Sequence, residues 1–382
     1  MTKQILKAYK VRLYPNEDQQ IFFAKSFGCS RFIWNKMLAD KIEYYRETKM
    51  SLNNTPAQYK KEFEWLKEVD SLALANVQQN LRSAYSKFFK QGARLPKFKK
   101  KGIKDSYTTN NQKGTVAITD STVKLPKIGH INAKFPDKIN GLIKSATISR
   151  TPSGKYYVSL LVETIVNELP KTQSNIGIDL GLTDFIVLSD STKVANPKFL
   201  AKLQDKLSKA QKIMSKRALI AKKDNRNLRD SKNYQKQKTK VAKVYEKITN
   251  ARKDFLHKLS FNLIKNHDVI AIEDLNVKGM VKNRKLANSD SSWSTFTIML
   301  AYKADWYGKT LVKIDRWYPS SKTCSHCNHL LTKAELPLSV RMWDCPSCLQ
   351  QNDRDINASI NILHQGLILA KQSKTVGATG LA

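Results

Sequence analysis

Three acidic residues occupy positions where a carboxylate is unusual. Asp179 lies near the end of the apolar segment 175–180, and Glu273 ends the apolar segment 269–273. Asp355 opens an amphipathic pattern typical of a helix. A carboxylate in a buried strand costs free energy unless its charge is compensated, and in so basic a chain a divalent cation is the best explanation. Oxygen ligands favour Mg²⁺ or Mn²⁺, and two such ions could hold a phosphodiester for hydrolysis.

Each of these acids also has a simpler interpretation. An aspartate at the start of a helix is a common N-cap, and for Asp355 that role is as plausible as metal binding. Asp184, Asp274 and Asp353 are close enough in the sequence to be confused with the three ligands. The motif GIDLG at 177–181 also resembles the first phosphate loop of actin-like and Hsp-type chaperone ATPases. No second glycine-rich loop is found, however, and the charge of the chain does not suit such an ATPase.

Four of the five cysteines form two C-x2-C pairs separated by 17 residues, namely Cys324 with Cys327 and Cys345 with Cys348. In a large basic chain without a secretion signal, this spacing predicts one structural, tetrahedral Zn²⁺, a knuckle at each pair and a short hairpin between the pairs. His326 and His329 are possible substitute ligands, although four cysteines suffice, and Cys29 stands alone. The second pair lies just before Asp355, so folding of this segment could help to position that acid.

The charge of the chain indicates a polyanionic partner. Its 382 residues include 67 Lys and Arg against 32 Asp and Glu, a formal charge of +35. A compact body with this charge repels itself unless a polyanion shares it, and nucleic acid is the obvious one. A membrane surface is the alternative, but no apolar run reaches the roughly 18 residues of a spanning helix and the N-terminus is not a signal peptide. We therefore expect a soluble cytoplasmic protein.

Two basic segments are the strongest candidates for nucleic-acid contacts. One is the break at 94–101, and the other is the helical stretch 201–258, which has 19 Lys and Arg against 5 Asp and Glu. That surplus is too lopsided for an ordinary solvated helix, which usually mixes its signs. We predict phosphate contacts from Lys97, Lys99, Lys100, Lys222, Lys223, Arg226 and Arg229.

The remaining patterns predict a multidomain α/β protein. Residues 5–14 alternate as in a strand, and the chain from 16 to about 90 has a helical pattern with many aromatic residues, most of which we expect in a core. Short strands over 105–165 indicate a small β-barrel or sandwich, into which 5–14 could pair. Residues 371–382 are expected to be disordered. Further strands are predicted at 175–180, 185–188, 269–273 and 311–314, with helices within 201–258, at 292–307 and at 355–370.

Seven longer motifs are spread over nearly the whole chain: LYPNEDQQIFFAKSFGCSRFIWN (13–35), GIDLGLTDF (177–185), RKDFLHKLSFNLI (252–264), IEDLNVKGM (272–280), WSTFTIMLAYKADWYG (293–308), YPSSKTCSHC (318–327) and DRDINASINI (353–362). Together they resemble the TnpB family, RuvC-like nucleases carried by insertion sequences and related to type V CRISPR effectors. Carried over position by position, the family's catalytic acids correspond to Asp179, Glu273 and Asp355, and its zinc ligands to the four paired cysteines.

The resemblance also implies an architecture. It consists of a wedge β-barrel with an inserted helical recognition domain, followed by an RNase H-like (RuvC) domain that is split by a zinc ribbon. The implied boundaries are 1–14 and 95–170 for the wedge, 15–94 for the recognition domain, 171–318 and 353–370 for the nuclease domain, 319–352 for the ribbon, and 371–382 for a disordered tail.

The implied activity is RNA-guided, metal-dependent cutting of double-stranded DNA beside a short transposon-adjacent motif, linked to insertion-sequence maintenance in the bacterial or archaeal cytoplasm, near the nucleoid. The guide RNA would come from the element's own end, and the cofactors would be two Mg²⁺ or Mn²⁺ ions and one structural Zn²⁺. No base-reading module such as a helix-turn-helix is evident, so base pairing would supply specificity. Two alternatives stay open: a nuclease-inactive RNA-guided repressor, whose signature would be substituted acids, and a guide-independent transposase or resolvase.

Three residues depart from the family pattern. The glycine that often follows each C-x2-C pair is replaced by Asn328 and Leu349, and the histidine that often precedes DRD is replaced by Asn352. A left-handed backbone suits asparagine but suits leucine poorly, so these changes bear on the geometry of the cysteine segment. No catalytic acid is replaced.

Overall fold

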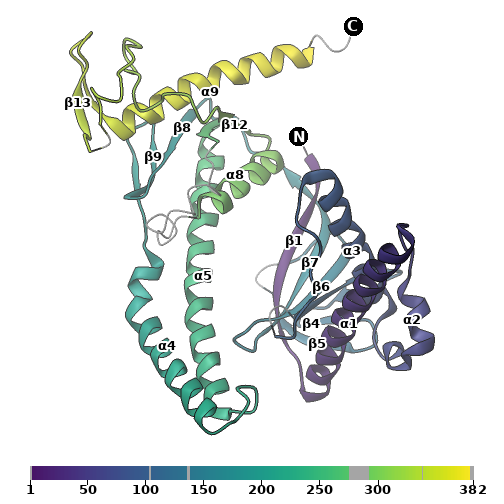
Figure 1. The fold of residues 1–382 in the computed structure, drawn as a ribbon. Coiled ribbons are helices and arrows are strands. Elements are labelled where there is room, and N and C mark those ends of the chain that lie inside the picture. Colours follow the sequence, from purple (N-terminus) through teal and green to yellow (C-terminus); the bar gives the residue numbers. More distant parts are fainter. Residues whose placement is uncertain (1, 103–104, 136–137, 275–291, 338, 379–382) are drawn as a thin grey trace. The chain divides into compact units, whose positions relative to one another are not determined.

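The computed structural model describes residues 2–102, 105–135, 138–274, 292–337 and 339–378 (Figure 1), with the side chains of 200 and 373–378 left aside. The chain divides into two compact units. One unit is Gln4–Ile165, and the other is Val166–Ala382 together with Met1–Lys3. The IEDLNVKGM motif beyond Asp274 lies outside the described residues.

The helices of the first unit are α1 (Glu17–Thr48), α2 (Pro56–Glu62), a 3₁₀ turn (Glu64–Lys67) and α3 (Ser71–Gln91). Asn16 caps the start of α1. Its side chain accepts the backbone N–H of Gln19 at 2.9 Å, and the Gln19 side chain accepts the N–H of Asn16 at 3.1 Å. This reciprocal pair satisfies two donors that a helix start leaves without partners. Buried residues such as Ile33 and Leu74 join α1 and α3 in one core.

The strands of the first unit are β1 (Thr2–Tyr14), β2 (Asp105–Asn110), β3 (Ala117–Ile118), β4 (Thr122–Leu125), β5 (Gly129–Lys134), β6 (Leu142–Arg150) and β7 (Tyr156–Asn167). They form one sheet in the order β2-β6-β7-β1-β5-β4-β3. The predicted pairing of 5–14 into this sheet is confirmed, since Arg12 lies opposite Lys134. Among the described residues the sheet is open, with β2 and β3 at its edges, whereas a barrel or sandwich was predicted. Alternation predicts strands but does not decide whether the two edges meet.

Aromatic residues of α1 fill the space between that helix and the sheet. Phe23 and Phe27 are buried beside Tyr107 of β2, and Phe23 also stacks on Tyr156 of β7 with ring centroids 5.6 Å apart. The prediction that most of the N-terminal aromatics belong to a core is confirmed for these residues. Phe89, near the end of α3, is an exception because it is 76% exposed.

The second unit is built on a five-stranded mixed sheet. Its strands are β8 (Asn175–Leu180), β9 (Asp184–Leu188), β10 (Lys193–Ala195), β11 (Val269–Glu273) and β12 (Thr310–Ile314), in the order β10-β9-β8-β11-β12. The strands β8, β11 and β12 run parallel, and β9 and β10 continue the sheet in antiparallel pairs. All four predicted strands are present, and β10 was not predicted. With three residues it is too short to show a periodic pattern.

The helices described in this unit are α4 (Phe199–Lys223), α5 (Lys232–Asn266), α8 (Trp293–Tyr307) and α9 (Arg354–Ala378). The helix α4 packs along α5. The helices α5 and α8 pack on one face, and α9 packs on the other (Figure 1). The basic stretch 201–258 forms two helices, α4 and most of α5. The tail predicted to be disordered from residue 371 is helical up to 378, because α9 continues that far, and 379–382 lie outside the described residues.

The part of the chain around the two cysteine pairs, about residues 319–352, is called the cysteine segment. At its end a small antiparallel strand pair forms, β13 (Met342–Asp344) and β14 (Gln351–Asp353). This hairpin encloses the second cysteine pair, and an isolated bridge between Thr323 and Leu330 encloses the first. Each pair thus lies in a hairpin of its own, which agrees with the predicted knuckles. The described residues between the two pairs form no hairpin among themselves, so that part of the prediction is wrong. The C-x2-C spacing indicates metal ligands but does not indicate which strands close around them.

Two glycines allow α9 to lie against the backbone of the sheet. A Cβ added at Gly177 of β8 would come 2.1 Å from the carbonyl oxygen of Ser359. A Cβ added at Gly366 of α9 would come 2.4 Å from the Cβ of Ala271 in β11. Both distances are too short for any side chain, so these contacts fix where α9 lies over β8 and β11.

We predict that Gly177→Ala destabilises the protein by about 1–3 kcal/mol, because the added methyl group meets backbone that cannot turn away. Gly28→Ala is the matched control. It lies inside α1, where a Cβ would meet nothing closer than an Arg31 side-chain nitrogen at 4.0 Å, so it should be neutral or stabilising by up to about 1 kcal/mol. Thermal unfolding of the two variants measures the difference, and equal midpoints would contradict the close contact with α9.

Candidate functional site

Two of the predicted acids lie at the ends of neighbouring parallel strands. Ile178 of β8 is in register with Ile272 of β11, so Asp179 and Glu273 follow side by side. Successive side chains of a strand point to opposite faces. The two isoleucines are buried in the core with α5 and α8, so the two acids point to the face that α9 covers.

The third acid reaches the same edge of the sheet through α9. Asp355 lies in the first turn of that helix. Ser359, one turn further along α9, lies over Gly177, and Asp179 is two residues beyond Gly177 on β8. The charges of Glu273 and Asp355 both act on the carboxyl group of Asp179. The structure therefore places the three acids that the sequence singled out at the same edge of the sheet, where the charges of two of them act on the third.

The protonation of these acids is perturbed by their environment. Burial, reinforced by the charges of Glu273 and Asp355, raises the pKa of Asp179 to about 7. Burial also raises the pKa of Glu273, while a hydrogen bond from Ser320 opposes that shift. Repulsion between gathered carboxylates is what a bound cation relieves. Carboxylate oxygens are the donors that Mg²⁺ and Mn²⁺ prefer, so the chemistry of these three side chains suits such an ion.

Asp353 has a different role from Asp355. One Asp353 oxygen accepts the backbone N–H groups of Asp355 and Ile356, at 3.0 and 3.1 Å, which caps the start of α9. The other oxygen forms an ion pair with Lys193 at 2.6 Å. Although burial opposes it, these contacts hold the pKa of Asp353 below its ordinary value. The N-cap interpretation considered for Asp355 thus applies to Asp353 instead.

The other two neighbouring acids also have their own surroundings. Asp274 pairs with Arg316 at 2.7 Å, and its side chain is 45% exposed. Asp184 begins β9 and lies opposite Ala195 of β10. Neither arrangement resembles that of Asp179 and Glu273.

Sequence reasoning missed two residues that touch the acids. Arg341, from the cysteine segment, contacts Asp355 with 3.2 Å between Nη1 and Oδ1. The hydroxyl group of Ser320 donates to Glu273 Oε1 at 2.5 Å. Ser320 was inside the YPSSKTCSHC motif, which could have indicated it, whereas no local pattern distinguishes Arg341 from other surface arginines.

The four paired cysteines form one cluster whose ligand atoms all lie within 4.8 Å of one another. The sulfur atoms of Cys324 and Cys348 are 3.7 Å apart, and those of Cys327 and Cys345 are 3.6 Å apart. Tetrahedral zinc with Zn–S bonds of about 2.3 Å requires sulfur separations of about 3.8 Å. The cluster therefore fits one Zn²⁺, as predicted, and neither His326 nor His329 belongs to it within the described part of the chain.

The two cysteine pairs have equivalent backbones. Asn328 donates to the carbonyl of Cys324 at 2.9 Å, and Leu349 donates to that of Cys345 at 2.8 Å. Both acceptors are the first cysteine of a pair. Asn328 has φ 62° and Leu349 has φ 58°, so both adopt the left-handed conformation that the family's glycine would favour. Asn352 is buried, and its amide approaches the Cys324 sulfur at 3.9 Å.

The basic residues predicted to contact nucleic acid lie in two regions of the structure, one beside α1 and one at the end of the α4–α5 hairpin. Lys99 lies over the Trp34 ring at 3.8 Å, and the Lys97 carbonyl accepts the Trp34 indole N–H at 3.0 Å. Lys99 and Lys100 line a groove of 720 Å³ within the first unit. Its lining includes Arg31, Asn76, Asn80, Thr147 and Ser149.

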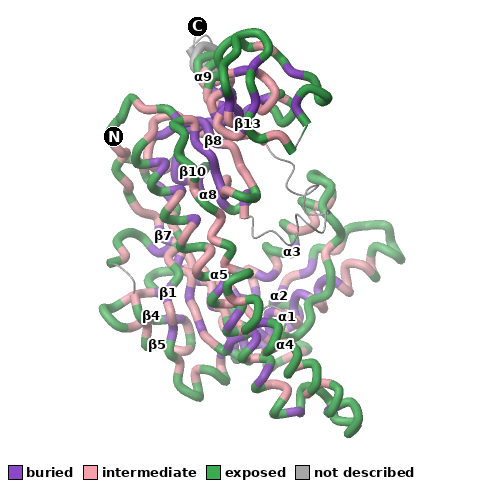
Figure 2. Tube along the Cα trace, turned by 90° about the vertical axis from the view of Figure 1, so that its left-hand side faces the viewer, coloured by how far each residue is buried: buried purple, intermediate pink, exposed green. Residues whose placement is uncertain are grey.

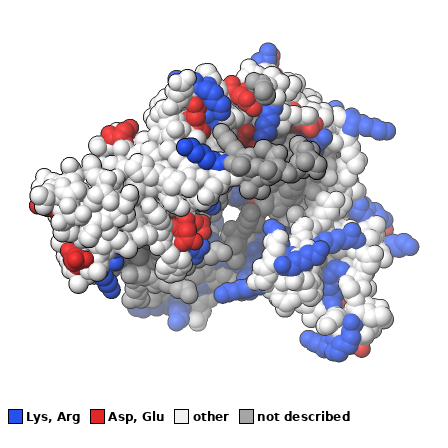
Figure 3. All heavy atoms as spheres, turned by 90° about the horizontal axis from the view of Figure 1, so that it is seen from above, with Lys and Arg blue, Asp and Glu red and all other residues white. Residues whose placement is uncertain are grey.

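The second basic place is the far end of the α4–α5 hairpin. Lys222 and Lys223 end α4, and Arg226 and Arg229 lie in the turn that follows. All four are exposed, and Figure 2 shows the end of this hairpin as largely exposed. Arg226 pairs with Asp224. Lysine and arginine side chains are also prominent on the face drawn in Figure 3.

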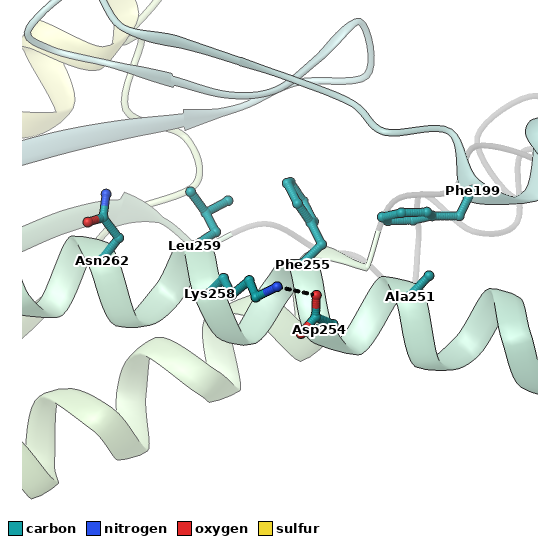
Figure 4. A pocket seen from close by; sticks show the side chains of 7 residues that line it. All are labelled: Phe199, Ala251, Asp254, Phe255, Lys258, Leu259 and Asn262. Atoms are coloured by element: carbon teal, nitrogen blue, oxygen red, sulfur yellow. Dashed lines mark ion pairs between the residues drawn. The ribbon is translucent and has the colours of Figure 1, made fainter.

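A further groove, of 460 Å³, lies along α5 (Figure 4). Phe199, Phe255 and Leu259 give it an apolar lining, and Asp254 and Lys258 form an ion pair across 2.8 Å beside them. It contains none of the three gathered acids. We therefore place the candidate chemistry at the sheet edge and not in this groove.

Comparison with known proteins gives the family. Residues 157–284 match a family model described as a probable transposase, and 293–362 match one described as a Cas12f1-like TNB domain. A Streptomyces pristinaespiralis protein named "Putative RNA-guided DNA endonuclease" is 35% identical over 96% of this chain and 91% of its own length. An Escherichia coli (strain K12) protein named "Putative RNA-guided DNA endonuclease InsQ" is 30% identical over 94% of this chain and 92% of its own length. The chain belongs to the TnpB (OrfB) family.

A solved structure supports the fold. The chain aligns with the protein in a structure titled "Cryo-EM structure of the Cas12f1-sgRNA-target DNA complex", with a TM-score of 0.58 and 14% identity over 94% of this chain and 98% of that one. The fold is therefore Cas12-like. Residues 1–50 match a model described as a helix-turn-helix domain, whereas the sequence analysis found no helix-turn-helix. The described residues there form β1 and one long helix, α1. Within the described residues, no helix is both long and apolar enough to span a membrane.

The left-handed leucine generates a stability prediction. A non-glycine residue in this conformation costs roughly 1–2 kcal/mol, and Leu349 is 82% exposed, so its side chain contributes little burial in return. Leu349→Gly should raise the stability of the cysteine segment and slow zinc loss to a chelator. Asn328→Gly is the matched control and should change less, because asparagine tolerates this backbone. Equal effects of the two variants would contradict the strain at Leu349.

The raised pKa of Asp179 generates a pH prediction for Mg²⁺-free protein with its zinc retained. The folded state favours protonated Asp179 because its pKa is raised there. The contribution of Asp179 to the free energy of unfolding is therefore complete below about pH 4 and is lost as the pH rises to about 7. Asp179→Asn removes this loss and should be more stable than the unchanged protein at pH 8, by at most a few kcal/mol. The gain should vanish towards pH 4. Unfolding midpoints across this range test it, and a gain independent of pH would contradict it.

Proposed function

We propose that this protein is an RNA-guided, divalent-metal-dependent endonuclease that cuts double-stranded DNA. Family membership and the names of the relatives support the activity. The single observation that carries the proposal is the gathering of Asp179, Glu273 and Asp355 at one edge of the five-stranded sheet. All three belong to motifs by which the sequence resembled this family.

The domain assignment is part of the proposal. The five-stranded sheet with α9 would be the RuvC-like nuclease domain, 171–318 and 353–370, and the cysteine segment 319–352 would be the zinc ribbon that splits it. The seven-stranded sheet would be the wedge domain, with helices α1 to α3 as the recognition domain. A ribbon inserted between β12 and α9 is consistent with the four-cysteine cluster in that place.

In this proposal the chain's own residues prepare the site for phosphodiester hydrolysis. Asp179, Glu273 and Asp355 would hold two Mg²⁺ ions, which supply activation of water and stabilisation of the leaving oxygen when bound. Arg341 lies against Asp355 and carries a charge suited to a DNA phosphate. The cap on α9 by Asp353 and its ion pair with Lys193 keep Asp355 in place.

The partners in the proposal are a guide RNA from the element's own end and a DNA target beside a short motif. The positive hairpin end with Lys222, Lys223, Arg226 and Arg229 suits the backbone of an RNA or of a guide–target duplex. The groove beside Lys99 and Lys100 combines cations with amide and hydroxyl groups. Such groups contact phosphates and base edges together. We propose that this groove binds the short DNA motif beside the target. The biological role of the cutting would be maintenance of the insertion sequence.

Of the two other functions, the site disfavours one and does not distinguish the other. A nuclease-inactive repressor would be expected to lack one of the acids, yet all three are present and lie together. A guide-independent transposase or resolvase remains the rival, because it would use the same acids. Dependence on RNA distinguishes it from the proposed enzyme.

The test uses protein purified from cells that carry its own locus. We expect an RNA of that locus to co-purify, and RNase treatment before target loading to end site-specific cutting. Changing the guide segment should redirect the cut to a new target beside the same motif. Asp179→Ala, Glu273→Ala and Asp355→Ala should each abolish cutting while DNA binding is nearly unchanged, because the basic surfaces remain.

Asp353→Ala and Asp274→Ala are the matched controls, and both should retain more activity than their neighbours. RNA-free protein that cuts one defined DNA sequence with Mg²⁺ would replace the guided proposal with the resolvase one. Normal cutting by Asp355→Ala together with an inactive Asp353→Ala would overturn the choice of the third acid.

A further inference from the structure

A single serine connects the acidic centre to the cysteine segment. Ser320 follows β12, and its hydroxyl group donates to Glu273 Oε1 at 2.5 Å. Ser320 is only 5% exposed, so this hydrogen bond is shielded from water. Its own carbonyl oxygen accepts the side-chain amides of Asn361 at 2.8 Å and Asn357 at 3.4 Å. Two asparagines of α9 therefore fix the backbone of Ser320, while the Ser320 hydroxyl group is bonded to Glu273.

The same two asparagines hold the backbone around the first cysteine pair. The carbonyl of Thr323 accepts Asn361 at 2.6 Å and Asn357 at 2.8 Å. The backbone N–H of Ser325 donates to Asn357 Oδ1 at 2.8 Å. Residues 323 and 325 flank Cys324, a member of the four-cysteine cluster. Asn357 and Asn361 are four residues apart and thus share one face of the helix, and both are almost fully buried.

We propose that Ser320 is a positioning residue that orients the Glu273 carboxylate for divalent metal binding, and that Asn357 and Asn361 set the position of Ser320. Through these contacts the folding of the cysteine segment is coupled to the affinity of the acidic centre for its metal. This inference rests on the proposed function, because it deepens the account of the same site.

The physical reason lies in the freedom of a glutamate side chain. Glu273 has three rotatable bonds, and without a partner its carboxylate would lose rotamer freedom each time a metal ion bound. The bond from Ser320 occupies one oxygen, fixes the plane of the carboxylate and leaves the other oxygen for an ion. Hydrogen bonds that orient metal ligands in this way typically change metal affinity or activity by 10–100-fold when they are removed.

The experiment uses the full chain with its RNA. It compares Ser320→Ala, Ser320→Thr, Asn361→Ala and the double variant that combines Ser320→Ala with Asn361→Ala. The first readout is the Mg²⁺ concentration for half-maximal single-turnover cutting, beside target-DNA affinity and zinc content. The second readout is independent of nuclease activity: Fe²⁺ with ascorbate cuts the polypeptide next to bound metal, and mass spectrometry measures cleavage near 179 and 273 against Fe²⁺ concentration. Ser359→Ala is the matched control, since among the described residues this buried hydroxyl donates only to the Ile356 carbonyl, at 2.7 Å.

We expect Ser320→Ala to raise the required Mg²⁺ and Fe²⁺ concentrations by about tenfold, with DNA affinity and zinc content unchanged. Ser320→Thr and Ser359→Ala should behave like the unchanged protein. Asn361→Ala should shift the metal requirement in the same direction, and the double variant should be no worse than Ser320→Ala, because both changes act through one hydroxyl group.

Fully additive effects, or an unchanged metal requirement in Ser320→Ala, would overturn the inference and leave both residues with a structural role. Failure of the proposed function looks different: the unchanged complex would not cut its target at any Mg²⁺ concentration. In that case the Fe²⁺ readout still decides whether Ser320 controls metal binding at Glu273.

Discussion

The close contact between α9 and the five-stranded sheet determines the geometry of the acidic centre. Gly177 and Gly366 remove the side chains that would otherwise separate helix from strands, and Ala271 is small enough to meet Gly366. Because the helix lies directly on the backbone, its first turn is fixed along β8 as well as above it. Asp355 therefore reaches the carboxyl ends of β8 and β11, where alternation has already turned Asp179 and Glu273 to the same face.

Placing three carboxylates near one another carries an unfavourable electrostatic free energy, and the surrounding chain reduces it. The carboxylates of Asp179, Glu273 and Asp355 repel one another, and burial of Asp179 increases that penalty. Asp355 is partly compensated by Arg341 and by its place in the first turn of α9, where the helix dipole favours negative charge. The net charge of +35 of the whole chain acts in the same direction, although screening confines such long-range effects to about 8–10 Å at physiological salt. The remaining repulsion favours a cation, so metal affinity and unfavourable folding energy have the same origin.

Much of this site could be predicted because its parts are local in the sequence. Asp179 and Glu273 each end a short apolar strand, and the cysteine pairs have a recognisable spacing. The YPSSKTCSHC motif could have indicated Ser320 as a residue of the site. The contact of Ser320 with Glu273, like that of Arg341 with Asp355, could not be predicted, because each depends on where the cysteine segment folds back against the sheet. The separate roles of Asp353 and Asp355 were also open in the sequence. Two aspartates at a helix start differ only in which one accepts the backbone N–H groups, and that depends on the backbone of β14. The open edges of the seven-stranded sheet likewise depend on tertiary contacts and not on the alternation of any strand.

The order of elements along the chain explains why the cysteine cluster and the acidic centre are linked. β12 pairs directly with the strand that carries Glu273, and α9 carries Asp355. The whole cysteine segment lies between them, so a long connection must close before α9 can dock, and closing a flexible loop costs entropy. Zinc binding shortens that connection by joining its two cysteine pairs, and metal affinity then becomes folding energy. Asn357 and Asn361 extend the effect, because they attach the folded segment to α9 at the residues next to Cys324. A structural metal can thus act on the Glu273 carboxylate without touching it, by determining whether the backbone that holds Ser320 is in place.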